Sequence, residues 1–127
     1  MQRETEFRGK ERKTGKWVFG NLVISQGGTL EGRHYHIFPI EEEGMHWVDP
    51  ETVGEYTGLK DKKSIKIFEG DIVKDPLDDI GVIVFSDDFC GWKIEYHNFG
   101  GGSWRTPRND IEVIGNIHDN PELLHAN

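Results

Sequence analysis

The chain has little of what would place a protein outside the cell or in a membrane. Its 127 residues include one cysteine, Cys90, which cannot form an internal disulfide or supply a cage of thiolate metal ligands. No apolar run approaches the roughly 20 residues that span a bilayer, and residues 1–10 lack the apolar core of a signal peptide. These absences argue against a small secreted scaffold and a membrane protein, and they predict a cytoplasmic location.

Basic residues are also scarce. There are 15 Lys and Arg against 23 Asp and Glu, so the formal net charge is −8 and bulk binding of nucleic acid is disfavoured. The basic residues are enriched in residues 1–17, whereas residues 41–57 contain several acids and neither Lys nor Arg. This uneven distribution predicts a dipolar surface through which two copies of the chain would meet head to tail.

The apolar stretches that are present are short, rich in β-branched and aromatic residues, and separated by Gly, Asp, Asn and Pro. This pattern predicts a mainly β fold with one hydrophobic core. Residues 17–24 follow a turn at Thr14-Gly15 and are apolar on both faces, which predicts a central strand covered on both sides. Further strands are expected at 33–40, 45–48, 65–68, 71–74, 82–85, 89–96 and 111–114, with single helical turns at 49–52 and 120–124.

A pair of histidines forms the most suggestive metal-binding pattern. His34 and His36 alternate along an expected strand, so both rings would share a face and could bind zinc with a third histidine. The chain offers neither a thiolate pair nor a helical His-Glu-x-x-His motif to complete a ligand set. We therefore expect a polar strand face at these residues, with no metal or other cofactor.

Catalytic chemistry has weak support. The doublet Asp87-Asp88 is adjacent in sequence, so on a strand its two carboxylates would point to opposite faces, and it is more typical of a turn. Cys90 lies between Phe89 and Gly91, near Trp92, and is expected to be a small buried apolar side chain. We expect no catalytic residues and a protein that is not an enzyme.

The segment after residue 98 has the ingredients of a binding surface. Three consecutive glycines precede a tryptophan and two arginines, and such loops often contribute much of the free energy of an interface. The partner would be a protein or a single-stranded nucleic acid, or else the loop only connects strands. The predicted binding residues are Phe99, Trp104, Arg105 and Arg108.

Three segments resemble a known family: residues 56–62, 67–73 and 113–124 are similar in order and spacing to the YopX family, over about residues 53–124. The resemblance implies a phage or prophage protein without an assigned biochemical function. It also implies a small open β-barrel of Src-homology-3 type over about 53–127, with an N-terminal β-hairpin layer over about 1–52, in a single domain. Lys63-Ser64 replaces the Asn-Gly that is usual in the family. This replacement argues against a tight two-residue turn at that position. The motif residues have structural roles in turns, strand starts and caps, and they are Tyr56, Gly58, Leu59, Glu69, Gly70, Asp71, Asn120 and Pro121.

These patterns favour a non-enzymatic accessory protein that binds a protein partner, either a second copy of itself or another phage or host protein. A nucleic-acid-binding small barrel is the first alternative, and a metal-dependent hydrolase is the second. Membrane binding is not expected.

Overall fold

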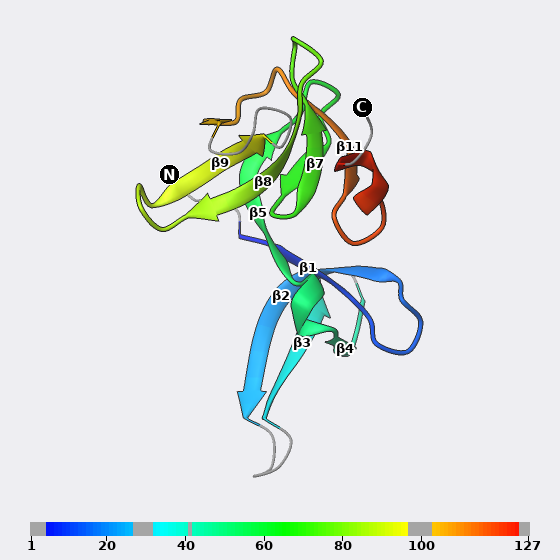
Figure 1. Cartoon of the computed structure of the whole chain (residues 1–127). Helices are drawn as coiled ribbons and strands as arrows, with labels where there is room; N and C mark the ends of the chain where they lie inside the picture. The colour runs from blue at the N-terminus through cyan, green and yellow to red at the C-terminus, as the bar shows by residue number, and fades with distance from the viewer. Residues whose placement is uncertain (1–4, 27–31, 41, 97–102, 125–127) are drawn as a thin grey trace. The chain divides into compact units, whose positions relative to one another are not determined.

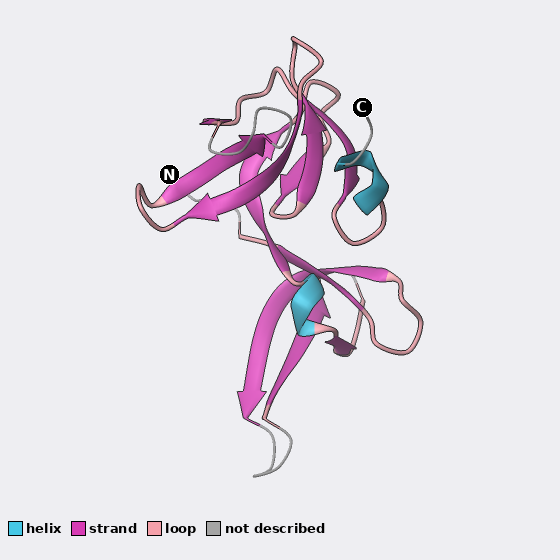
Figure 2. Ribbon diagram, viewed as in Figure 1, coloured by secondary structure: helices cyan, strands magenta, loops and turns pink. Residues whose placement is uncertain are grey.

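The computed structural model describes residues 5–26, 32–40, 42–96 and 103–124, and almost all of its regular structure is β-strand (Figures 1 and 2). The mainly β fold predicted from the sequence is confirmed. The chain forms two compact units, Met1–Tyr56 and Thr57–Asn127, which are described separately below.

The first unit contains an antiparallel sheet. Its strands are β1 (Phe7–Lys10), β2 (Trp17–Gln26), β3 (Arg33–Pro39) and β4 (His46–Val48). A short 3-10 helix, η1 (Pro50–Thr52), then leads into β5 (Gly54–Lys60), which runs on into the second unit and is followed there by β6 (Lys66–Phe68). Neighbouring strands follow the order β4-β3-β2-β1-β5-β6.

The first hairpin forms where the sequence predicts it. Gly15 has a φ of +71°, an angle that suits glycine, and its N–H donates a hydrogen bond to the Glu11 carbonyl at 2.8 Å. The helical turn expected at 49–52 is η1, where the Asp49 carboxylate accepts a hydrogen bond from the Glu51 N–H and Pro50 occupies the first turn.

The core of the first unit lies on one face of its sheet. Ile37 and Val48 are fully buried, and Gly9 packs so closely that a β-carbon there would lie 3.1 Å from Val48. Strand β4 pairs with β3 and also meets the end of β1 through a bridge between Glu11 and Val48. The sheet therefore curls over Ile37 and Val48, and the face that carries them is its inner face.

The prediction that residues 17–24 are covered on both sides is wrong. Strand β2 is central, because it lies between β1 and β3. However, Phe19 and Val23 on one face and Ile24 on the other are all exposed. Apolar residues at both parities indicate two-sided burial only where a second layer of structure packs on the outer face.

The second unit contains an antiparallel meander. After β6 the chain forms β7 (Asp71–Lys74), β8 (Ile80–Ser86), β9 (Gly91–Tyr96), β10 (Trp104–Arg105) and β11 (Glu112–Asn116), and then the 3-10 helix η2 (Pro121–Leu124). The strand order is β10-β9-β8-β7-β11, and in the part of the chain that is described neither sheet closes into a barrel.

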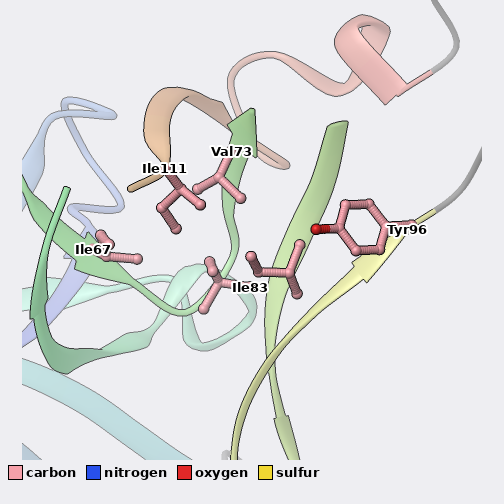
Figure 3. Close-up of a cluster of buried hydrophobic side chains, with 6 residues drawn as sticks. Ile67, Val73, Ile83, Tyr96 and Ile111 are labelled. Carbon is pink, nitrogen blue, oxygen red and sulfur yellow. The ribbon is translucent and has the colours of Figure 1, made fainter. Parts of the chain in front are cut away.

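The core of the second unit is aliphatic with one tyrosine (Figure 3). It consists of Ile67, Val73, Ile83, Ile94, Tyr96 and Ile111, with Leu59, Trp92 and Val113 packed against it. The Tyr96 hydroxyl donates a hydrogen bond to the Asp75 carboxylate at 2.9 Å. Burial and this bond raise the pKa of Tyr96 to about 12.

Turns in the second unit are closed by buried carboxylates. Gly70 has a φ of +90°, the positive angle expected of it, and it leads directly into the fully buried Ile72 and Val73. The Asp71 carboxylate accepts a hydrogen bond from the Phe68 N–H at 2.8 Å, across the same turn. Gly58 also has a positive φ, of +86°.

Asp61 joins the β5–β6 turn to β11. One carboxylate oxygen accepts the N–H groups of Lys63 and Ile65 at 2.8 and 2.9 Å, and the other accepts that of Val113 at 2.9 Å. Burial by itself raises the pKa of Asp61, but the three N–H groups outweigh it and hold the pKa below its ordinary 3.8. Ser64 takes a φ of +65° in this turn, so the loop closes without the family's usual glycine.

Replacing Asp61 with alanine should destabilise the protein by about 3 kcal/mol, because three backbone N–H groups lose a charged acceptor. Urea denaturation at pH 7 measures the change. Asp88→Ala is the matched control, since Asp88 is exposed in a turn, and it should change stability by less than about 0.5 kcal/mol. A midpoint for Asp61→Ala equal to that of the control would contradict the structural role.

Candidate functional site

The outer face of the N-terminal sheet carries exposed aromatic side chains. Directly paired residues share a face, and the pairs Val23 with His36 and His36 with Trp47 lie on the face opposite Ile37 and Val48. Side chains here are unusually exposed for apolar residues: Phe19 44%, Val23 44%, Phe38 38% and Trp47 43%. We call this surface the outer aromatic face, and it comprises Phe19, Val23, His34, His36, Phe38 and Trp47 together with Arg12.

Trp47 contacts two other side chains of this face, His34 and Arg12. The His34 ring stacks on it with 4.9 Å between ring centroids and 19° between planes. The Arg12 guanidinium carbon lies 4.9 Å from the Trp47 ring centroid, a cation–π arrangement. The backbone N–H of Arg12 also donates a hydrogen bond to the backbone carbonyl of Trp47 at 3.0 Å. Backbone pairing therefore holds a guanidinium group against an exposed indole.

A second tryptophan on the same face also lies beside cations. Lys10 pairs with Trp17 in register, and its ammonium lies 5.5 Å from the Trp17 ring centroid. The buried Arg8 guanidinium lies 4.7 Å from the same ring. None of the outward-facing positions within strands β1–β4 is Asp or Glu. Within these strands, Lys10 is therefore the charged side chain that is partly exposed on the outer face.

The two histidines predicted as weak metal ligands lie together on this face. The ring centroids of His34 and His36 are 6.3 Å apart, and Ser25 Oγ lies 3.3 Å from His36 Nε2. His46 pairs with Ile37 in register, so it belongs to the opposite face. Among the residues that the structure describes, no group of three or more His, Cys, Asp or Glu side chains could hold a metal ion. His97 lies outside those residues.

His46 positions the turn that carries Arg12. Its Nδ1 is hydrogen-bonded to the Glu11 carboxylate, and its Nε2 lies 3.6 Å from that of Glu42. The Thr14 hydroxyl donates to Glu11 at 2.8 Å. These hydrogen bonds, first that from His46 and then that from Thr14, hold the pKa of Glu11 below its ordinary 4.5.

The second predicted site is divided between two strand faces. Trp104 is 49% exposed, stacks on Phe89 with centroids 4.9 Å apart, and has the Lys93 ammonium 5.7 Å from its ring. The next residue along β10, Arg105, projects to the other face and donates a hydrogen bond to Asp110 at 2.7 Å. Arg108 is exposed, and Phe99 lies outside the described residues. The structure therefore does not gather Trp104 and Arg105 into one surface.

The prediction that Cys90 is buried is wrong. Strand β9 begins at Gly91, so Cys90 lies in the preceding turn, where it is exposed and has a φ of +56°. Asp87 and Asp88 are exposed in the same turn, the location that their sequence pattern suggests.

A family model for the YopX protein matches residues 6–125. The chain belongs to the YopX family. The match includes the likeness seen at about residues 53–124 and extends it over the N-terminal sheet. The outer aromatic face is thus a feature of a YopX-family protein.

One solved structure extends the comparison. The crystal structure of protein EF1440 from Enterococcus faecalis superposes with a TM-score of 0.56 at 22% sequence identity, covering 97% of this chain and 99% of that one. This likeness concerns the fold alone. No curated protein matches the chain. Within the described residues there is no helix long and apolar enough to cross a bilayer.

Acidification should weaken the pairing of Glu11. Since the pKa of Glu11 is lower in the folded state, its contribution to stability is present above pH 4.5 and is lost as the pH falls through the folded value. The free energy of unfolding of Glu11→Gln should therefore decrease less below pH 4.5 than that of the parent chain. Urea denaturation at a series of pH values measures this difference. Glu43→Gln, an exposed acid in the neighbouring loop, should leave that dependence unchanged. Identical pH profiles for Glu11→Gln and the parent chain would argue against the paired carboxylate.

The Cys90 thiol should react with a disulfide-exchange reagent in the native protein. We expect one thiol per chain to be modified without denaturant, at a rate within about tenfold of a free thiol, because the side chain is exposed. Release of the chromophoric thiol from Ellman's reagent measures this. Modification only after unfolding would show that the turn is covered.

Proposed function

We propose that this YopX-family chain is a phage- or prophage-encoded accessory protein that acts in the host cytoplasm by binding a protein, without catalysis. Its partner is a second copy of the chain or another phage or host protein. The observation that carries the proposal is the outer aromatic face, where Trp47 and three other large apolar side chains are exposed and Arg12 lies against Trp47. The C-terminal unit serves as an open small barrel of Src-homology-3 type in this proposal.

The composition of the outer aromatic face supports a protein partner. Tryptophan and arginine are the residues most enriched among those that dominate interface energies. Apolar side chains at the centre with charged groups around them are also the usual arrangement of protein interfaces. Phe19, Val23 and Phe38 provide exposed apolar surface on this face, and Arg12 and Lys10 provide charge beside Trp47 and Trp17 respectively.

The buried carboxylates support a non-enzymatic function, because hydrogen bonds within the fold already engage them. Asp61 accepts backbone N–H groups in the β5–β6 turn, and Asp71 does so in the β6–β7 turn. Asp75 accepts two further backbone N–H groups and the Tyr96 hydroxyl. Carboxylates used in this way hold turns in place and are not available for acid–base work.

Self-association has additional support from the edges of the sheets. Strand β6 ends one sheet and strand β10 ends the other, and an edge strand can pair with another chain. The exposed turn with Arg12, Lys13 and Lys16 is basic, and the exposed loop with Glu42 and Glu43 is acidic. Two copies would bring these opposite charges together.

A nucleic-acid-binding function is the second candidate. It is favoured by Trp104, which is exposed beside the Lys93 ammonium and stacked on Phe89, since bases stack on exposed aromatic rings that lie near cations. The ion pair between Arg105 and Asp110 removes one of the charges that this function would need. For this reason the protein-binding function is preferred.

Size-exclusion chromatography with light scattering, over a range of protein and salt concentrations, tests self-association. The mass should rise with protein concentration, and Trp47→Ala should weaken association about tenfold, because truncating a central interface tryptophan costs roughly 1–2 kcal/mol. Trp104→Ala is the matched control, being an equally exposed tryptophan in the other unit, and it should associate normally. A monomer at every concentration would reject self-association.

A further inference from the structure

We infer that the outer aromatic face recognises an acidic polypeptide segment, one in which carboxylates alternate with or flank large apolar side chains. This inference rests on the proposed protein-binding function and adds the chemistry of the partner. Three features carry it: the sign of the charge in the turn beside the face, the geometry of Arg12 on Trp47, and the exposed apolar side chains of the face.

The exposed turn after β1 places positive charge beside this face, although the chain as a whole is acidic. Among the outward positions of strands β1–β4 Arg8 is buried, Lys10 is partly exposed, and none is a carboxylate. The exposed turn after β1 adds Arg12, Lys13 and Lys16. The one acid of this turn is Glu11. Its backbone forms a β-bridge with Val48 of the inner face, and its carboxylate is hydrogen-bonded to the side chains of His46 and Thr14. An acidic ligand that contacts this turn therefore meets local attraction, whereas Glu42 of the acidic loop lies beside His46 of the inner face.

Arg12 is arranged to receive a carboxylate. A guanidinium that lies against an aromatic ring can still direct its N–H groups sideways, and their fork geometry matches the two oxygens of a carboxylate. The Arg12 guanidinium lies against Trp47, and the His34 ring stacks on the same indole. The hydrogen bond from the backbone N–H of Arg12 to the backbone carbonyl of Trp47 fixes the position of the Arg12 backbone, from which that side chain extends. This preorganisation lowers the entropic cost of binding.

The centre of the face provides sites for apolar side chains. Asn21 pairs with Phe38 and Val23 with His36, so Phe38 and Val23 lie on adjacent strands of the same face. Both are substantially exposed, as is Phe19 on β2. Removing such surface from water contributes roughly 25 cal/mol for each Å² that is buried. A ligand with carboxylates alone would leave this surface uncovered, which is why the proposed segment also carries apolar groups.

A nucleic acid fits these features less well. Its affinity depends on many phosphate contacts, whereas the centre of this face is apolar and its cations lie in and near strand β1. The net charge of −8 also repels a long polyanion. A short acidic peptide lies largely within one Debye length, about 8 Å at physiological salt, of the cations it contacts.

Fluorescence anisotropy with labelled octapeptides tests the inference. The probe consists of glutamates with phenylalanine at its third and sixth positions. One control peptide has glutamine in place of glutamate, and a second has alanine in place of phenylalanine. The acidic phenylalanine peptide should bind at least about tenfold more tightly than either control, and the difference from the glutamine peptide should shrink in high salt.

Variants locate the binding site. Arg12→Gln should weaken binding of the acidic peptide about tenfold, the effect of losing one charge-assisted hydrogen bond worth roughly 1.4 kcal/mol. Arg108→Gln removes the same charge from an exposed position in the other unit and should leave binding unchanged. Equal effects of the two substitutions, or an effect of Arg108→Gln alone, would overturn the assignment to the outer aromatic face.

The outcomes separate this inference from the proposed function. Equal binding of the glutamate and glutamine peptides would overturn the inference, while self-association in light scattering would still support protein binding. Tighter binding of an eight-residue oligothymidylate than of the acidic peptide would overturn both in favour of nucleic acid. A monomeric chain that binds the acidic peptide through Arg12 would reject self-association and support the inference.

Discussion

Burial of Ile37 and Val48 is the constraint on which the N-terminal sheet depends. Both side chains are removed from water, and a strand alternates its side chains between two faces, so their burial fixes the orientation of β3 and β4. A register shift of one residue would expose them and bury His36 and Trp47 instead. The exposed aromatic rings are thus a consequence of the core, and the bridge from Glu11 to Val48 brings the basic turn beside them.

The second unit uses its polar groups for a different purpose. Its buried aspartates accept backbone N–H groups in turns, and Asp61 also reaches Val113 on β11. Turns with few apolar contacts need such bonds, because buried backbone groups without partners are costly. Asp61, Gly70 and Asp71, which lie in the family motifs of this unit, therefore have roles in its turns. The features that suggest a partner lie mainly in the first unit, which the family match includes.

Local chemistry determined what could be predicted from the sequence. Alternating and β-branched patterns located most strands, and the turn at Gly15 and the bend at Gly70 followed from the backbone freedom of glycine. The exposure of Phe19 and Val23 was missed, since composition does not reveal whether a second layer covers a strand. Cys90 was misplaced because β9 begins after it. Pairing of Arg105 with Asp110 depends on a fold that brings back a residue five positions away, which no pattern signalled.

Two-dimensional amide NMR during dilution is the most direct test of whether the outer aromatic face is the binding surface. We predict concentration-dependent shifts at the backbone amides of Val23, His36 and Trp47 and at the Trp47 indole, with the Trp104 indole unchanged. These shifts should decrease as salt is added, because charge contributes to the contact. Shifts confined to Trp104 and Arg108, or none at any concentration, would contradict an interface on the outer face of the N-terminal sheet.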